Sequence, residues 1–314
     1  MIETQVKVPE LAFIRLRSPD LDEAEAFLTD FGLAKVARTP TALYMRGTDG
    51  NHHLHVTELG EPKVVGFGYL ATDASDLAKL AGPQAVESLD EPGGGKRVVL
   101  TDPLGFQIEI LADVTRLPAM PVKRQHLNVG AHGIMRPGEL MRPTLGASQV
   151  KRIGHAVVHA TDLPGTVAWY RDKLGMLGTD DVWVGEPDHV IASFNRLDRG
   201  DEMVDHHVLF VVQQKRNGLN HISFEVQDLD DVMTGHEHLK AAKKYQHSWG
   251  IGRHFLGSQI FDYWQDPWNR IHEHWTDSDV LNASHPQGSH SVDVGFASQW
   301  GDDAPASFVQ HSVL

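Results

Sequence analysis

Two histidines and one glutamate in the second half of this 314-residue sequence could bind one metal ion. His155 lies in the strand-like run KRIGHAVVH, His221 in LNHISFEV and Glu273 in RIHEHW. A single buried histidine is more often a hydrogen-bonded core residue than a ligand. Two imidazoles and one carboxylate on one face of a metal, however, form the facial triad of non-heme iron(II) sites, which leaves positions open for substrate and oxygen. The set therefore predicts an iron-type centre.

The elements that must position these residues occur twice, with a period of about 150 residues that indicates a duplicated domain and excludes a solenoid. LRSPDLDEAEAFLTDFGL (16–33) matches VHATDLPGTVAWYRDKLGM (158–176), and GFGYLATDASDLAKLA (66–81) matches HISFEVQDLDDVMTGH (221–236). Each stretch begins like a strand and continues through a Ser, Thr or Asp cap into a helix, and the first pair ends at a glycine. We therefore expect strand–helix units in both halves.

The aligned repeat distinguishes the two halves chemically. TDPLGFQIEIL (101–111) matches QDPWNRIHEHW (265–275), where an Asp-Pro turn precedes a strand. Three residues of the first half stand opposite the candidate ligands: Phe13 opposite His155, Gly66 opposite His221 and Glu109 opposite Glu273. Two of the three ligands are therefore missing from the first half. Ordinary core histidines would not divide in this way, so the pattern favours one working and one vestigial site.

Each half is predicted to fold as β-α-β-β-β twice over, which gives an α+β protein with short antiparallel strand sets. We expect a non-catalytic domain at 1–112, a linker at 113–149 rich in Pro, Gly and basic residues, and a metal-binding catalytic domain at 150–280. The polar tail 281–314 is either disordered or packed over a pocket, and the sequence does not separate these alternatives.

Composition excludes several classes of function. The absence of cysteine removes disulfides, thiolate metal sites and a cysteine nucleophile. No run of 18 apolar residues could cross a membrane, and the start of the sequence does not resemble a signal peptide. A net charge of −14 argues against non-specific nucleic-acid binding. These features are compatible with a cytoplasmic protein.

Five motifs give the chain a specific resemblance: GHAVVHATDL, DHHVLFV, LNHISFEV, GRH and YWQDPWNRIHEHW, in this order. Over residues 8–280 the sequence resembles the two-domain type I extradiol ring-cleavage dioxygenases of the vicinal oxygen chelate superfamily. The resemblance implies two tandem domains, each an incomplete barrel around a central pocket, with Fe(II), or alternatively Mn(II), in the second. It also implies a homo-oligomer that acts with O2 on a catechol such as 2,4,5-trihydroxytoluene.

The same resemblance assigns three further site residues. His207 matches the acid–base histidine of the family, and His254 and Tyr263 match residues that assist bound substrate. Because successive strand residues face opposite ways, we expect His206 to point away from the metal pocket. For the same reason His272 and His274 should face away from the side that carries Glu273.

Alternatives remain for both substrate and class. A 3- or 4-alkylcatechol or a bicyclic catechol is the nearest rival substrate. A glyoxalase-like isomerase or lyase on the same repeat would need a fourth protein ligand, which Phe13 and Gly66 do not supply, and a ligand-sequestering protein would need no metal triad. Trp249, Phe255 and Phe194 could form apolar walls or belong to the core. Arg253 could bind an anionic substituent or anchor a loop.

Overall fold

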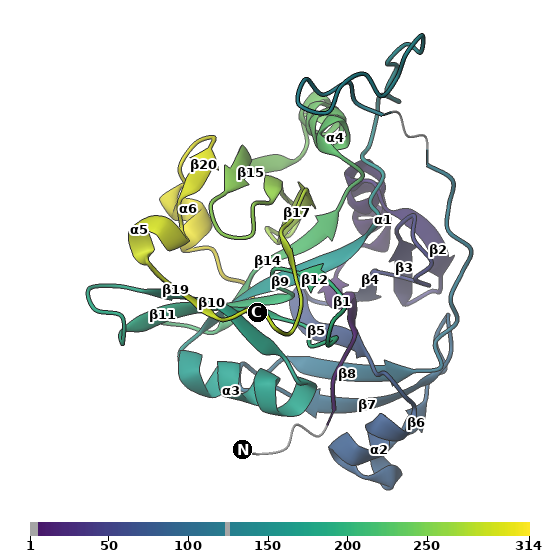
Figure 1. The fold of residues 1–314 in the computed structure, drawn as a ribbon. Coiled ribbons are helices and arrows are strands. Elements are labelled where there is room, and N and C mark those ends of the chain that lie inside the picture. Colours follow the sequence, from purple (N-terminus) through teal and green to yellow (C-terminus); the bar gives the residue numbers. More distant parts are fainter. Residues whose placement is uncertain (1–5, 123–125) are drawn as a thin grey trace.

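Two βαβββ modules in the first half share one eight-stranded sheet in the computed structural model, which describes residues 6–122 and 126–314 (Figure 1). Residues 1–5 and 123–125 of the predicted first domain and linker lie outside the described residues. The first module comprises β1 (Glu10–Ser18), α1 (Leu21–Phe31), β2 (Ala34–Arg38), β3 (Ala42–Arg46) and β4 (His55–Leu59). The second comprises β5 (Lys63–Leu70), α2 (Ser75–Ala81), a 3-10 helix (Pro83–Ala85), β6 (Glu87–Ser88), β7 (Lys96–Thr101) and β8 (Gln107–Ala112).

The second half repeats this plan within a ten-stranded sheet. Its first module comprises β9 (Arg152–Ala160), α3 (Leu163–Leu174), β10 (Leu177–Trp183), β11 (Val190–Arg196), the short β12 (Val204–Asp205) and β13 (Leu209–Gln213). Its second comprises β14 (Gly218–Glu225), α4 (Leu229–Ala242), β15 (Gln246–His254), β16 (Ile260–Gln265) and β17 (Ile271–Thr276). The strand order β10-β11-β13-β9-β14-β17-β16-β15 matches β2-β3-β4-β1-β5-β8-β7-β6 of the first half. The predicted duplication and the α+β class are both confirmed.

Helix ends follow the predicted capping signals. The side chain of Asp20 accepts hydrogen bonds from the backbone N–H groups of Asp22 and Glu23 at the start of α1, and Asp162 caps α3 in the same way. Gly32 ends α1 with a φ of 111°, in the left-handed region. A side chain at Gly32 would also collide with the backbone of Ser148, because its Cβ would lie 2.1 Å from the Ser148 carbonyl oxygen.

Strand register agrees with the alignment of the two halves. Glu109 lies opposite Gly68 on the neighbouring strand of the first half, and Glu273 lies opposite Ser223 in the second half. In the same way, Gly66 lies opposite Arg15 and His221 lies opposite Val157. Phe13 and His155 each lie two residues further back along the first strand of their half. The positions that the repeat places opposite one another in sequence are therefore equivalent in the sheets.

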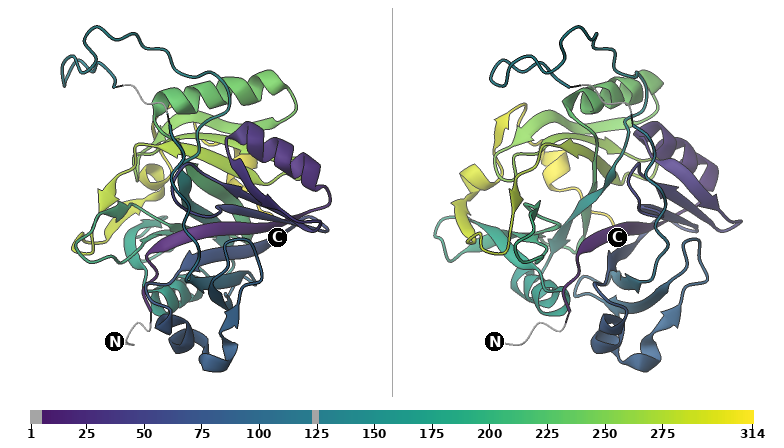
Figure 2. Two further views of the ribbon diagram at one scale, coloured as in Figure 1. Left: turned by 90° about the vertical axis from the view of Figure 1, so that its right-hand side faces the viewer. Right: turned by 45° about the vertical axis from the view of Figure 1, so that its right-hand side comes forward.

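The two halves share one apolar core, in which α1 lies beside α4 (Figure 2). Phe31 of α1 stacks on His274, with ring centroids 3.8 Å apart, and Phe27 lies against His272 at 5.1 Å. Both histidines are fully buried. They face away from Glu273, as predicted, but toward the first half and not toward solvent. Helix α1 buries the residues spaced three and four apart that face this core: Leu21, Ala24, Phe27, Leu28 and Phe31.

The tail 281–314 packs onto the second half and occupies both edges of its sheet. Its elements are β18 (Val280–Leu281), β19 (Gly288–Ser291), α5 (Val292–Gly295), β20 (Ser298–Trp300) and α6 (Ala306–Val309). Strand β19 pairs with β10 at one edge and β20 with β15 at the other, so the segment around α5 bridges the gap between the two edges. Of the two alternatives left open by the sequence, the structure shows the packed one.

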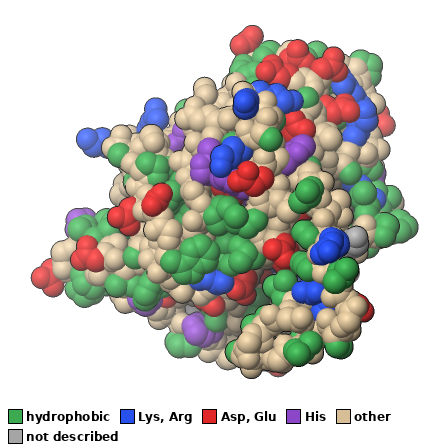
Figure 3. All heavy atoms as spheres, turned by 90° about the horizontal axis from the view of Figure 1, so that it is seen from above, with side chains coloured by type: hydrophobic (Ala, Val, Ile, Leu, Met, Phe, Trp, Pro, Cys, Tyr) green, Lys and Arg blue, Asp and Glu red, His purple; other side chains and the backbone are tan. Residues whose placement is uncertain are grey.

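The linker 113–149 contains no helix among its described residues, and a single isolated bridge joins Val129 to Gly133. Its described parts, 113–122 and 126–149, run over the outside of both halves (Figure 2). The face seen from above, toward α4, carries side chains of both charges and several histidines (Figure 3). None of the helices in the described part of the chain is long and apolar enough to cross a membrane.

Candidate metal centre

Three neighbouring strands of the second sheet bring the predicted ligands together. His155 lies on β9, His221 on β14 and Glu273 on β17, and these strands are adjacent in the order β9-β14-β17. The Nε2 atoms of His155 and His221 lie 3.1 and 3.4 Å from Oε2 of Glu273. All three side chains are at least 95% buried, with exposures of 3%, 5% and 0%. They therefore form one compact group that could hold a metal ion.

The hydrogen bonding around these residues fits a metal better than a satisfied core network. Nε2 of His221, Oε1 of Glu273 and Nδ1 of His155 are buried without a hydrogen-bond partner, which is uncommon in folded proteins. Nδ1 of His221 lies 2.7 Å from Oδ1 of Asn220, so Nδ1 carries the proton and Nε2 keeps a free lone pair. The hydroxyl of Ser223 donates to Glu273 and orients the carboxylate.

The Glu273 carboxylate is ionised despite its burial. Burial alone would raise its pKa, but the adjacent His155 holds the pKa of this carboxyl well below its usual range. Burial also lowers the pKa of His221, which keeps the ring neutral and able to act as a ligand. An anionic oxygen and neutral imidazole nitrogens are the donors that Fe(II), Mn(II) and Zn(II) accept.

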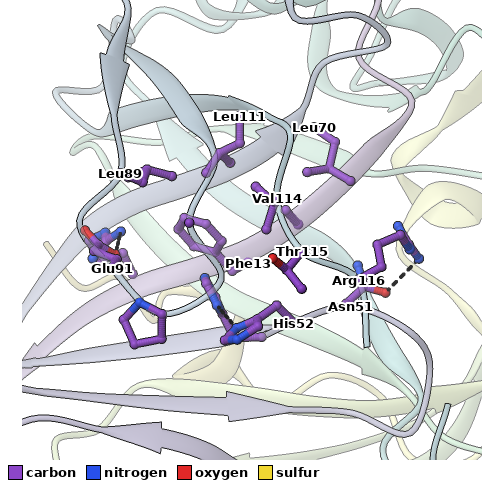
Figure 4. A pocket seen from close by; sticks show the side chains of 15 residues that line it. Phe13, Asn51, His52, Leu70, Leu89, Glu91, Leu111, Val114, Thr115 and Arg116 are labelled. Atoms are coloured by element: carbon purple, nitrogen blue, oxygen red, sulfur yellow. Dashed lines mark hydrogen bonds and ion pairs between the residues drawn. The ribbon is translucent and has the colours of Figure 1, made fainter. Parts of the chain in front are cut away.

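The equivalent place in the first half is filled by protein. Phe13 replaces His155, and its ring lies where Gly68 leaves space: a Cβ on Gly68 would lie 2.6 Å from that ring. Neither carboxylate oxygen of Glu109 is free to bind a metal here, because one accepts from Arg15 at 2.6 Å and the other from Arg97 at 2.7 Å. Figure 4 shows the ring of Phe13 at the small cavity that remains, of about 40 Å³. In the first half, Arg15 and Arg97 therefore supply the positive charge beside Glu109.

A cavity of about 410 Å³ adjoins the candidate metal group and is bounded mainly by apolar side chains. Val157, Phe194, Phe210 and Trp249 form part of its wall, together with the tail residues Val292, Phe296, Ala304, Phe308 and Val309. No lysine, arginine, aspartate or glutamate is among the described residues that line it. A pocket of this size and lining suits an uncharged aromatic molecule.

His207 lines this cavity beside the metal group, with its ring centroid 4.1 Å from that of His155. Burial lowers the pKa of His207 well below its usual value, and the neighbouring His155 adds to the effect. His206 turns away, and its Nε2 lies 2.7 Å from Asp180. The predicted orientations hold, but their predicted cause was wrong: both residues lie in the bend between β12 and β13, outside any strand. Strand alternation therefore does not decide which one enters the pocket.

His254 and Tyr263 lie at the same cavity on β15 and β16. The hydroxyl of Tyr263 is 2.8 Å from Nε2 of His254, and Tyr263 is directly opposite Glu273 in the β16–β17 pairing. Burial lowers the pKa of His254 to about 4 and raises that of Tyr263 well above 10. Both groups are therefore neutral hydrogen-bonding partners for a molecule in the cavity.

The structure adds one residue that the sequence analysis missed and decides between alternatives for two others. His159 lines the cavity, and its position four residues after His155 on one strand was a signal for the same face. Phe255 is 49% exposed and does not line the cavity, unlike Trp249 and Phe194. Arg253 anchors a loop by donating to the Ser258 carbonyl at 2.6 Å and pairing with Asp277.

Comparisons with known proteins agree with this geometry. Residues 152–269 match the model of the Glyoxalase/Bleomycin resistance protein/Dioxygenase superfamily. The chain is 30% identical over 306 residues to metapyrocatechase 2 of Cupriavidus necator, which covers 95% of this chain and 90% of that protein. The chain belongs to the extradiol ring-cleaving dioxygenases of this superfamily.

Two solved structures share the fold over almost the whole chain. The Mn(II)-bound glyoxalase of Novosphingobium aromaticivorans superposes with a TM-score of 0.78 at 23% identity, covering 98% of this chain and 95% of its own. Homoprotocatechuate 2,3-dioxygenase of Arthrobacter globiformis gives 0.79 at 19% identity, covering 100% and 95%. The predicted vicinal-oxygen-chelate fold in two tandem domains is thereby confirmed.

Proposed function

We propose that this enzyme opens the ring of an uncharged, substituted catechol beside its two hydroxyls, with His155, His221 and Glu273 holding Fe(II). The observation that carries the proposal is the convergence of two imidazoles and one carboxylate, with buried unpaired atoms, at the wall of an apolar cavity. The chemistry that bound Fe(II) supplies is chelation of two adjacent substrate oxygens and activation of O2. Mn(II) suits the same donors, so the metal must be identified directly.

The cavity residues have separate roles in this proposal. Neutral His207 takes a proton from a catechol hydroxyl and returns one during ring opening, for which an imidazole suits both directions. Tyr263 and His254 hydrogen-bond to the substrate oxygens and so orient the ring. The apolar walls and the tail exclude water from the reacting face.

The cavity lining supports a substrate without a carboxylate. A carboxylate is bound most strongly by a cationic side chain, and the described lining contains no lysine or arginine. We propose 2,4,5-trihydroxytoluene as the substrate, which would make the enzyme a trihydroxytoluene oxygenase. Alkylcatechols and bicyclic catechols fit the same lining and are the rivals.

The test is metal analysis of anaerobically purified protein, followed by oxygen-consumption assays on a panel of catechols. The panel holds 2,4,5-trihydroxytoluene, 4-methylcatechol, 2,3-dihydroxybiphenyl and, as the charged comparison, 3,4-dihydroxyphenylacetate. We expect iron, oxygen uptake with the uncharged catechols and kcat/KM at least about tenfold lower for the carboxylate. Isomerase activity on a glutathione adduct without oxygen uptake would instead support the glyoxalase-like alternative.

We also propose that the enzyme is a homo-oligomer, an expectation that rests on the family resemblance. Closed symmetric dimers are the commonest assemblies of soluble proteins, and larger ones follow the same rules. Light scattering at micromolar concentration should give a mass of at least two chains, each of 34.8 kDa. A monomeric mass would contradict the proposal.

A further inference from the structure

We propose that a second divalent metal ion binds on the outer side of the catalytic sheet, to His236, His247 and Asp262. The three residues come from α4, β15 and β16, and their ligand atoms lie within 4.8 Å of one another. Nδ1 of His236 is 3.2 Å from either oxygen of Asp262, and Nε2 of His247 is 2.8 Å from Oδ1. These separations are similar to those of the proposed active-site ligands.

This second group is separate from the active site. Asp262 and Tyr263 are successive residues of β16, so their side chains lie on opposite faces of the sheet. Tyr263 pairs with Glu273 on the cavity side, whereas Asp262 pairs with His274, which faces the core shared by the two halves. The His236 group therefore does not touch the substrate cavity.

The charge around Asp262 favours a cation. Asp262 is fully buried, and its ion pairs in the described part of the chain are with His236 and His247 and with no lysine or arginine. Without a metal, the two imidazoles and one indole N–H hydrogen-bond to this buried carboxylate, and a divalent cation held by the same carboxylate and imidazoles would compensate its charge more completely. The second oxygen of Asp262 accepts the hydrogen bond from the indole N–H of Trp264 at 2.6 Å, which fixes the carboxylate orientation.

One side of the group is open to solvent. The side chains of His236 and His247 are 15% and 32% exposed, so a water molecule can complete the coordination. Histidines are visible at the surface on the face toward α4 (Figure 3). Two imidazoles, one carboxylate and a water molecule are the ligands of a tetrahedral zinc-type ion. The bound ion ties α4 to β15 and β16.

The test uses metal-free full-length protein titrated with Zn(II) in a calorimeter, in four forms. Unaltered protein should bind two equivalents, His155→Ala one, His247→Ala one, and the double variant His155→Ala/His247→Ala none. Loss of a direct ligand should weaken binding by about 100-fold or more, the upper end of the effect of residues that only orient ligands. His247 is chosen because it is partly exposed, whereas removal of Asp262 would leave a buried gap.

Two controls make the result specific. His238→Ala, two residues from His236 on the same helix, removes a histidine that pairs with Asp30, and it should leave zinc binding unchanged. His155→Ala/His236→Ala alters the group from a different element and should also bind no zinc. If His155→Ala binds no zinc, or if both double variants bind one equivalent as tightly as His155→Ala does, the second site does not exist. If His155→Ala still binds two equivalents, the active-site assignment fails, but the loss in His247→Ala would still support the second site.

Discussion

Glu273 and Glu109 are equivalent residues with opposite surroundings, and this contrast gives the sharpest test of the metal centre. Glu273→Gln removes the anionic oxygen beside His155 and His221 and should abolish metal retention and turnover together. Glu109→Gln is the matched control: it should keep metal content and activity. It should still lower the free energy of unfolding, by about 1–3 kcal/mol, because Arg15 loses its one fully buried acidic partner, while Arg15 and Arg97 both keep their ion pairs with Glu91. Metal analysis and denaturant unfolding of both variants measure these effects. A metal-replete, active Glu273→Gln protein would refute the ligand set.

His207 should act in proton transfer without binding the metal. His207→Phe should keep its iron and its affinity for a catechol, while turnover falls by about 10²–10⁴-fold, the usual contribution of a positioned acid or base. His206→Phe is the neighbouring control. It loses the contact with Asp180 and the approach of its Nδ1 to that of His207, 3.1 Å away, so it should reduce stability more than turnover. Loss of iron from the His207 variant would make this residue a ligand.

At the scale of elements, the side chain of Asn220 links a metal ligand on strand β14 to the tail, in addition to the backbone bridge between Leu219 and Val313. Oδ1 of Asn220 accepts from His221, and its Nδ2 donates to the carbonyl oxygens of Phe308 and His311, each at 2.9 Å. Asn220 is therefore expected to set both the orientation of a ligand and the position of a cavity wall.

Asn220→Ala should weaken metal affinity by about 10–100-fold, as is usual when a residue that orients a ligand is lost. It should also raise the KM for the catechol, because the backbone at Phe308 and His311 loses two hydrogen bonds and the ring of Phe308 is held less firmly at the cavity wall. Asn217→Ala, in the turn before the same strand, removes only contacts with Thr161 and should change neither quantity. Unchanged metal affinity in Asn220→Ala would show that the ring of His221 is held by packing alone.

The sequence predicted elements whose signals are local. Apolar periodicity and caps such as Asp20 and Asp162 are local signals, and the structure contains these helices with the expected caps. The pattern of residues predicts a strand at His206 and His207, where the structure has a bend, because alternation does not reveal where strand pairing is interrupted. The tail was undecided because its helices and strands are only two to four residues long, too short for propensity to establish them. Their positions depend on pairing with β10 and β15, which are distant in sequence.

At the scale of the whole molecule, His272 and His274, which are buried between the two halves, should make the free energy of unfolding depend on pH. Burial lowers the pKa of His274 and of His272 to about 4 from the ordinary value of 6.5. Between these values the unfolded chain binds protons that the folded chain does not, so stability falls as the pH falls from 6.5 to 4. One such histidine corresponds to a loss of about 3 kcal/mol by pH 4.

His274→Gln keeps a donor for the Phe31 carbonyl but cannot titrate. In metal-free protein its free energy of unfolding should fall less steeply than that of the unaltered protein over this pH range. The difference should vanish above pH 7, where neither state gains a proton at this residue. Denaturant unfolding at several pH values measures the free energy of unfolding of both proteins. If it falls equally steeply with pH in both, protonation of His274 does not destabilise the fold.

The tail that forms part of the cavity wall also covers both edges of the ten-stranded sheet, through β19 and β20. Uncovered strand edges are templates for association with other chains. Substitutions that loosen this segment to admit bulkier molecules would therefore expose the backbone hydrogen-bonding groups of β10 and β15 at the same time. In variants of this enzyme selected for larger catechols, a loosened tail would therefore broaden the substrate range and increase aggregation together. Changes to wall residues of the sheet itself, such as Phe194 or Phe210, would widen the cavity while leaving both edges covered.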